Sequence, residues 1–168
     1  MLIYHPAFDA SHCIYRLTAL LVRLNSAVTW EQLRVLDFYY LFPSQLKSIS
    51  PWPSEIKEYK AIVKKIPSQY EDISNPSRIL FDLIEFQRAA IVELLAKGVV
   101  SKDRFDLGDI VANVSAVPSG FLEALSEDVF LSSDVFKVIV EALPKVEFNG
   151  PHGLKKRSGL LEYVYDVG

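Results

Sequence analysis

The side chains best suited to bind a metal ion are His5, His12, Cys13 and His152. Zinc sites usually take their ligands in pairs at short spacing, because each pair can chelate the ion. The spacing of these four residues matches no such pattern. We therefore expect no metal site.

Asp9 and His12 are three residues apart and could form an acid–base pair on adjacent turns of a helix. A simpler interpretation is available, because an aspartate just before an apolar helical repeat commonly caps the free amides of the first turn. We favour the capping role over the catalytic one.

Established catalytic motifs are absent from the sequence. It contains no P-loop, no glycine-rich dinucleotide-binding pattern, no HExxH and no GxSxG. This absence favours a chain that is not an enzyme and that needs neither a cofactor nor a small-molecule substrate.

Two groups of cations are candidate contacts for nucleic acid or for an acidic partner. Lys155, Lys156 and Arg157 are consecutive and lie between Gly153 and Gly159. The net charge of -3 gives the molecule no general attraction for phosphate polymers, so such a contact has to be local. The alternative for this cluster is a solvated turn.

The second group is His12, Arg16 and Arg23, which fall within about 40° of one another on a helical wheel. They form a basic stripe opposite an apolar face. A solvated helix face is the alternative interpretation.

The segment from Leu33 to Phe42 is apolar almost all round and predicts a helix buried on several sides. Trp30, Tyr39 and Phe42 are candidate anchors for a protein partner. Packing in the core is the alternative. Stacking of bases on Tyr39 and Tyr40 with Phe38 and Phe42 is a less favoured interpretation.

Hydrophobic periodicity and capping residues predict a mainly helical chain. The expected helices span residues 9–24, 29–42, 54–66, 75–97, 118–125 and 133–143, with a proline-rich loop over 43–53. Residues 107–114 fit either a strand or a short helix.

The tail predicts a β-hairpin. Residues 146–148 and 160–165 are short β-prone runs, and the segment between them is rich in glycine and lysine. Helices followed by a hairpin with a basic tip predict an α+β, winged-helix-like fold. One compact domain over residues 1–168 is expected, and two packed winged-helix-like halves, 1–66 and 75–168, are the alternative.

Bulk composition places the chain in the cytoplasm. A single cysteine excludes an internal disulfide, and half of the 168 residues are hydrophobic, which is enough for a core. The N-terminus lacks the pattern of a secretion signal, and no apolar run is long enough to span a membrane. We expect a protein without membrane contact.

Three segments carry a family resemblance: YHPAFDASHC at residues 4–13, LDFYYLFPS at 36–44 and GLKKRSGLLE at 153–162. With them the chain resembles the middle component of ABC-three-component systems of the Lamassu type, which are bacterial defence modules. The resemblance implies a small winged-helix subunit that joins an SMC-like ABC ATPase and an effector such as a nuclease. Such a complex acts against phage or plasmid DNA, and its middle component has no established catalytic residues. The alternative function is a stand-alone winged-helix DNA-binding regulator.

Overall fold

Every extended run of secondary structure in residues 5–68 and 73–163, which this computed structural model describes, is helical. The α-helices are α1 (Ala10–Arg23), α2 (Trp30–Leu41), α3 (Lys60–Lys64), α4 (Pro76–Asp82), α5 (Ile84–Ala96), α6 (Lys102–Asp106), α7 (Ser119–Glu127), α8 (Asp134–Lys137) and α9 (Leu154–Ser158). Short 3₁₀ turns cover Pro6–Phe8, Pro43–Ser48, Ser54–Tyr59, Val114–Ala116, Phe130–Ser132 and Leu143–Lys145, and a π-helical turn spans Val138–Ala142.

The helix starts follow the capping residues of the sequence. The Asp9 carboxylate accepts a hydrogen bond of 3.0 Å from the backbone amide of His12, which confirms its capping role. Thr29 and Gln32 form the reciprocal capping box that opens α2. Asn75 caps α4 and is followed by a proline at the first helical position. Capping chemistry therefore fixes where α1, α2 and α4 begin.

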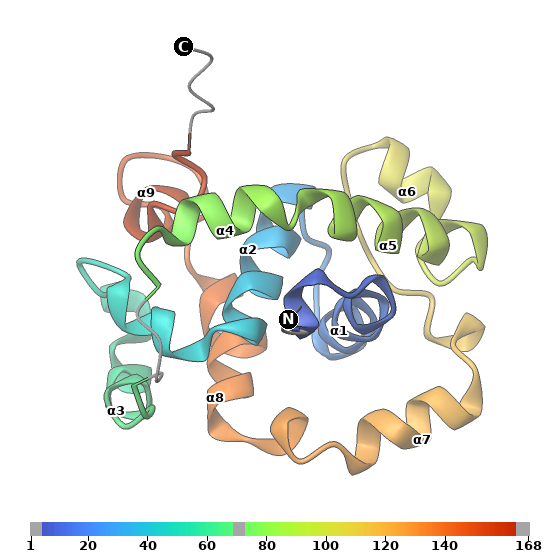
Figure 1. The fold of residues 1–168 in the computed structure, drawn as a ribbon, viewed down its shortest axis with the longest axis horizontal. Helices are drawn as coiled ribbons and strands as arrows, with labels where there is room; N and C mark the ends of the chain where they lie inside the picture. Colours follow the sequence, from blue (N-terminus) through green and yellow to red (C-terminus); the bar gives the residue numbers. More distant parts are fainter. Residues whose placement is uncertain (1–4, 69–72, 164–168) are drawn as a thin grey trace, which may run out of the picture.

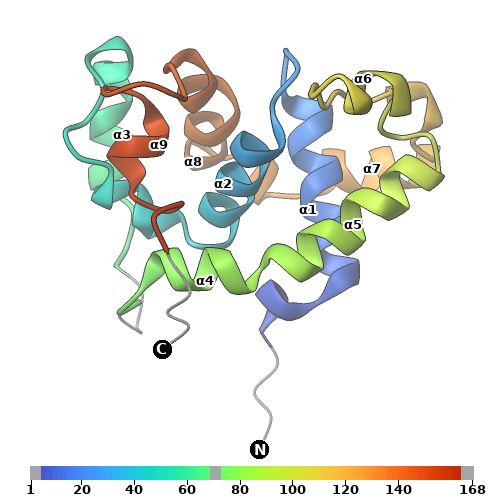
Figure 2. The same cartoon turned by 90° about the horizontal axis from the view of Figure 1, so that it is seen from above.

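α4 and α5 follow one another almost in line and form the longest helical stretch of the molecule (Figures 1 and 2). The break between them falls at Leu83, which keeps helical backbone angles. α1 packs against both α5 and α2. α7 and α8 lie on the far side of α1 from α5 (Figure 1). The first helix is thus enclosed by later parts of the chain.

A single cluster of buried hydrophobic side chains draws residues from both sides of the connector at 67–74. α2 runs through it, and Leu33, Leu36 and Phe38 are almost fully buried. This burial confirms the prediction of a helix covered on several sides.

The prediction of a β-hairpin, and with it the winged-helix α+β class, is wrong. Residues 146–148 and 160–163 form no strands, while 164 and 165 lie outside the described residues. In the described part of the chain, β-pairing is limited to isolated bridges, Val28 with Ile110 and Val100 with Ala112. The described fold is all-α.

Tertiary packing explains why the β-prone runs are not strands. Val146, Phe148 and Leu160 are buried in the helical core, so their apolar character serves burial and not strand pairing. The backbone amide of Leu154 donates to the carbonyl of Glu147 at 2.8 Å, which folds the tail back and starts α9. A helical turn therefore occupies the place of the expected hairpin tip.

The ambiguous residues 107–114 form neither a strand nor an α-helix. They run through a turn with Gly108 at a φ of +91°, through the bridge at Ile110, and into the 3₁₀ turn that begins at Val114. The left-handed φ at Gly108 is one that glycine adopts without strain.

Candidate functional site

A buried ion pair lies between α1 and α2. Nε of Arg16 lies 2.6 Å from Oδ1 of Asp37 and Nη2 lies 3.2 Å from Oδ2, so the pair is bidentate. Nη1 of the same guanidinium donates to the carbonyl of Pro6 at 3.1 Å and lies 2.6 Å from Nδ1 of His12. The arginine is fully buried and its donors are directed at acceptors inside the protein.

The network continues into α5 through Gln87. Its Nε2 donates to Oδ2 of Asp37 at 2.9 Å, and its Oε1 accepts from Nε of Arg34 at 3.0 Å. Nη2 of Arg34 also donates to the carbonyl of Leu80 at 3.2 Å. Side chains of α1, α2 and α5 are thereby joined by polar contacts in the middle of an apolar core.

This network changes the interpretation of the basic stripe. Arg16 is buried in the ion pair, His12 is half-buried beside it, and Arg23 alone of the three is exposed. The helical wheel placed all three on one face correctly, but α2 covers part of that face. Arg16 is therefore not available to a phosphate or to a partner surface.

The side chains of His12, Cys13 and Tyr15 lie in surroundings that shift their pKa values. Burial, then the neighbouring Arg16 charge, lower the pKa of His12. Burial raises the pKa of the Cys13 thiol to about 12, which removes the thiolate that a nucleophile needs. Burial and a hydrogen bond of 2.6 Å to Asp128 raise the pKa of Tyr15 to about 12. These groups fit structural roles.

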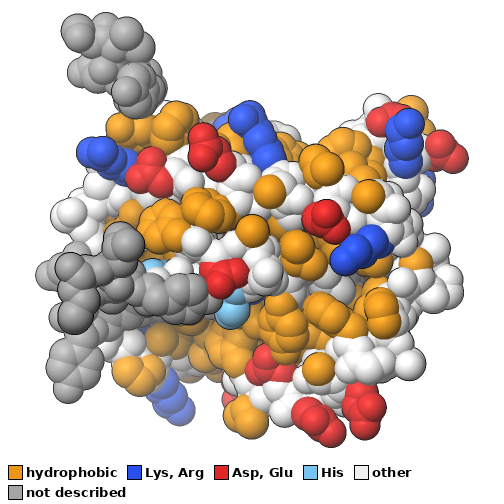
Figure 3. Space-filling model, turned by 45° about the vertical axis from the view of Figure 1, so that its right-hand side comes forward, with side chains coloured by type: hydrophobic (Ala, Val, Ile, Leu, Met, Phe, Trp, Pro, Cys, Tyr) orange, Lys and Arg blue, Asp and Glu red, His pale blue; other side chains and the backbone are white. Residues whose placement is uncertain are grey.

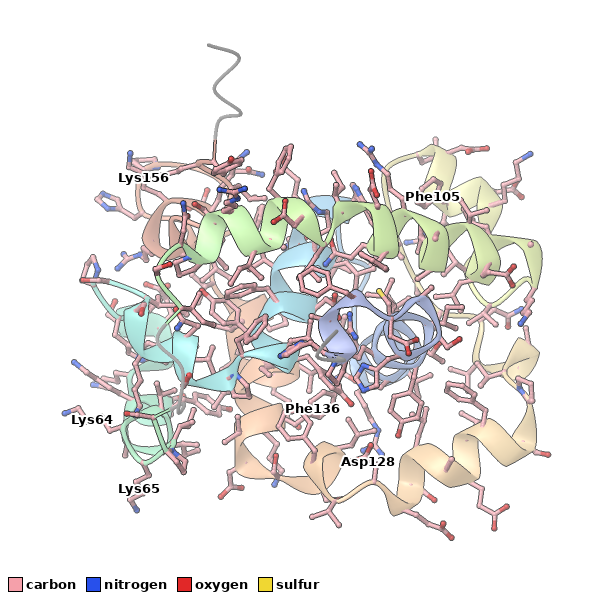
Figure 4. All side chains as sticks on the ribbon, in the orientation of Figure 1. Lys64, Lys65, Phe105, Asp128, Phe136 and Lys156 are labelled. Carbon is pink, nitrogen blue, oxygen red and sulfur yellow. The ribbon has the colours of Figure 1, made fainter. Side chains whose placement is uncertain are left out.

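The three consecutive cations of the tail lie on α9, and each has a different environment. Nζ of Lys155 pairs with Oε2 of Glu31 at 3.1 Å. Arg157 donates to the carbonyl of His152 at 2.6 Å and to that of Pro51 at 2.7 Å. Lys156 points away from the body of the protein (Figure 4). The cluster thus presents Lys156 outward, while its neighbours anchor α9 to the rest of the chain.

The three candidate anchors for a partner also differ in exposure. Tyr39 is 1% exposed and Phe42 is 7% exposed, values that are typical of core residues. Trp30 is partly buried and packs against the same core. Burial favours the core alternative for Tyr39 and Phe42, and leaves Trp30 as the partly accessible member.

A separate group of lysines, on α3 and on the 3₁₀ turn Pro43–Ser48, lines a surface pocket of about 460 Å³. Lys47, Lys60 and Lys64 line it together with Trp52 and Val63. Lys64 and the neighbouring Lys65 extend from α3 into solvent (Figure 4). Three lysines therefore give this pocket a basic character.

No group of three or more His, Cys, Asp or Glu side chains in residues 5–68 and 73–163 has a geometry suited to a metal ion. Over the same ranges, no helix combines the length and apolar character that a bilayer crossing requires.

Sequence reasoning missed Arg34, Asp37 and Gln87, which complete the polar network. A signal was present, because Arg34 and Asp37 are charged residues inside an otherwise apolar helix. Charged groups in such positions are buried only when they are paired or hydrogen-bonded. Their partners could not be identified, since Gln87 is 50 residues from Asp37.

An exposed apolar stripe follows α4 and α5. Phe81 on α4 is followed on α5 by Ala89, Val92 and Ala96, at spacings that place them on one helix face, which also carries the exposed Glu85 and Arg88. Val92 is 61% exposed. Figure 3 shows one face of the molecule, on which hydrophobic side chains are interspersed with isolated charges. We call Phe81, Ala89, Val92 and Ala96 the α4–α5 stripe.

Comparison with known proteins identifies the family. The family model described as "ABC-three component (ABC-3C) system Middle Component 5" matches residues 2–166. Searches of curated proteins and of solved structures gave no match. Because the family model covers nearly the whole chain, this protein belongs to the Middle Component 5 family of ABC-three-component systems.

Proposed function

We propose that this chain is a non-catalytic adaptor subunit that holds an SMC-like ABC ATPase and an effector nuclease in one cytoplasmic defence complex directed against phage or plasmid DNA. The observation that carries the proposal is the family match over residues 2–166, because a middle component belongs to a system built around an ABC ATPase. ATP hydrolysis is then assigned to the ATPase component.

The contacts of the buried polar side chains support a non-catalytic role. Arg16, Asp37 and Gln87 satisfy one another inside the core, and the side chains of His12 and Cys13 are packed around them. A catalytic group has to reach a substrate in the correct protonation state. The buried network instead holds three helices in a fixed arrangement.

The α4–α5 stripe supports a role in assembly. It places apolar side chains on the outer face of the longest helical stretch, where Val92 is 61% exposed. Exposed apolar faces on a folded subunit are commonly covered by a partner. We assign the ATPase component to this stripe and a different surface, near Trp30, to the effector.

DNA is contacted through the assembled complex in this proposal. Exposed cations suited to such contacts include Arg23, Lys156 and the lysines around the Trp52 pocket. Phosphate contacts by several lysines give binding that weakens steeply with salt.

Co-expression of the system with one component omitted at a time tests the bridging role. The ATPase and the effector are expected to co-purify when this chain is present and to separate when it is omitted. Co-purification of those two components without this chain would contradict the adaptor role. Tight, salt-sensitive binding of duplex DNA by the isolated chain, with no association to either component, would favour a stand-alone regulator.

A further inference from the structure

The buried polar network carries a surplus positive charge. It contains the guanidinium groups of Arg16 and Arg34 but only the carboxylate of Asp37, which pairs with Arg16. Arg34 is 8% exposed and forms no ion pair with any carboxylate of the described residues. A buried charge without an opposite charge is unfavourable, so this arrangement calls for an anion.

Arg34 also lines a small pocket at the surface. The pocket has a volume of about 70 Å³ and is lined by Arg34, Ser77, Phe81, Leu160, Leu161 and Tyr163. Nε and Nη2 of the guanidinium are used inside the protein, whereas Nη1 donates to no described residue. At least one charged donor is therefore free for a ligand in the pocket.

Local charges reinforce the positive character of this site. Burial, then the nearby guanidinium of Arg88, lower the pKa of Arg34, and Glu31 acts in the opposite direction. The Glu31 carboxylate is itself paired with Lys155 at 3.1 Å. Glu31 thus has a partner other than Arg34.

We propose that this pocket binds a carboxylate, supplied by an aspartate or glutamate side chain of another component of the system. A single charged donor, surrounded mainly by leucine and aromatic side chains, suits a monovalent carboxylate with an apolar stem, while the hydroxyl of Ser77 already donates to Asn75. A phosphate group carries more charge and takes several strong donors. The partner assignment rests on the proposed adaptor function, and Phe81 makes the pocket continuous with the α4–α5 stripe.

The carboxylate preference can be tested on the isolated full chain with acetate as the probe. The ¹⁵N–¹H signal of the Arg34 Nε–H group is followed by NMR during titration with sodium acetate, sodium phosphate or sodium chloride at constant ionic strength. A saturable shift with acetate at Arg34, and none at the exposed Arg104, is expected. A flat response at Arg34, or saturation by phosphate at a lower concentration than by acetate, would overturn the proposal.

Substitution at Leu161 tests the source of the carboxylate. Leu161→Glu places a carboxylate at the pocket wall, and Leu161→Gln is the matched uncharged control. The glutamate variant is expected to melt at a higher temperature than the glutamine variant, to lose the acetate response and to bind the ATPase component at least tenfold more weakly. Equal melting temperatures and equal affinities for the ATPase component in the two variants would overturn the proposed carboxylate site.

The acetate titration and the binding measurements distinguish this inference from the adaptor proposal. An acetate response in a wild-type chain that binds no other component would overturn both the protein source of the carboxylate and the adaptor role, while the pocket would stand as a carboxylate site. Normal assembly without an acetate response would overturn the pocket and leave the adaptor role intact.

Discussion

Arg16 on α1 and Asp37 on α2 form a fully buried, bidentate ion pair, with Nε of the arginine 2.6 Å from Oδ1 of the aspartate. The pair joins two helices whose facing surfaces are otherwise apolar. Gln87 of α5 donates to the same carboxylate, so Asp37 is the acceptor shared by three helices. Its removal leaves the Arg16 guanidinium in the core without an opposite charge.

Asp37→Ala is expected to lower the free energy of unfolding by about 3–5 kcal/mol, because it leaves a buried cation unpaired. Urea titration followed by circular dichroism measures the change. Asp134→Ala is the control, since Asp134 forms an exposed pair with Lys137 and should change stability by less than about 0.5 kcal/mol. Similar losses in the two variants would refute the structural role of the buried pair.

The surroundings of His12 predict a stability that falls in acid. Burial and Arg16 lower the pKa of His12 in the folded protein below its ordinary value of 6.5. The unfolded chain therefore binds a proton more readily, and the stabilisation is present above pH 6.5 and is lost as the pH falls below it. Unfolding measured from pH 8 to pH 5 should show this loss in the wild type and a smaller loss in His12→Gln. His152→Gln is the control at an exposed histidine, and the hypothesis fails if it reduces the loss as much.

Arg157 and Lys156 should behave differently although they are adjacent. Arg157 joins α9 to the carbonyls of His152 and Pro51, so Arg157→Ala is expected to cost about 1 kcal/mol of stability. Lys156→Ala removes an outward-pointing side chain and should stay within about 0.5 kcal/mol. Thermal melts of the two variants provide the comparison. A larger loss for Lys156→Ala would contradict the assigned contacts.

The helices and their starts could be predicted from the sequence because they depend on local chemistry. Asp9, Thr29 and Asn75 cap helices through bonds that span three residues. The tail could not be predicted in this way, because the burial of Val146 and Phe148 depends on distant helices. Their β-propensity was outweighed by that packing.

The candidate site was harder to predict, for a related reason. A helical wheel shows that Arg16 and Arg23 share a face of α1, but it does not show what packs there. Burial of Arg16 depends on Asp37, 21 residues away, and that of Arg34 on Gln87, 53 residues away. Long-range pairing of this kind has no local signature in a single sequence.

Two glycines should respond in opposite ways to substitution by alanine. A Cβ atom at Gly153 would lie 2.4 Å from the carbonyl oxygens of Phe148 and Asn149, so Gly153→Ala has to displace backbone and is expected to cost about 1–3 kcal/mol. At Gly120, within α7, a Cβ meets nothing within 4 Å. Gly120→Ala is expected to stabilise by up to about 1 kcal/mol. The denaturant midpoints of the two variants test the close backbone approach at Gly153. A stabilising effect of Gly153→Ala would contradict that close approach.

Affinity of the isolated chain for the ATPase component shows whether the α4–α5 stripe is the surface through which the two assemble. Val92→Glu places a charge in the stripe, and Val129→Glu places the same charge on a side chain that is 85% exposed and lies before the Phe130–Ser132 turn. Calorimetry should show Kd raised at least tenfold, about 1.4 kcal/mol, by Val92→Glu, with Val129→Glu close to wild type. Unchanged affinity in Val92→Glu, with both variants folded, would contradict the account.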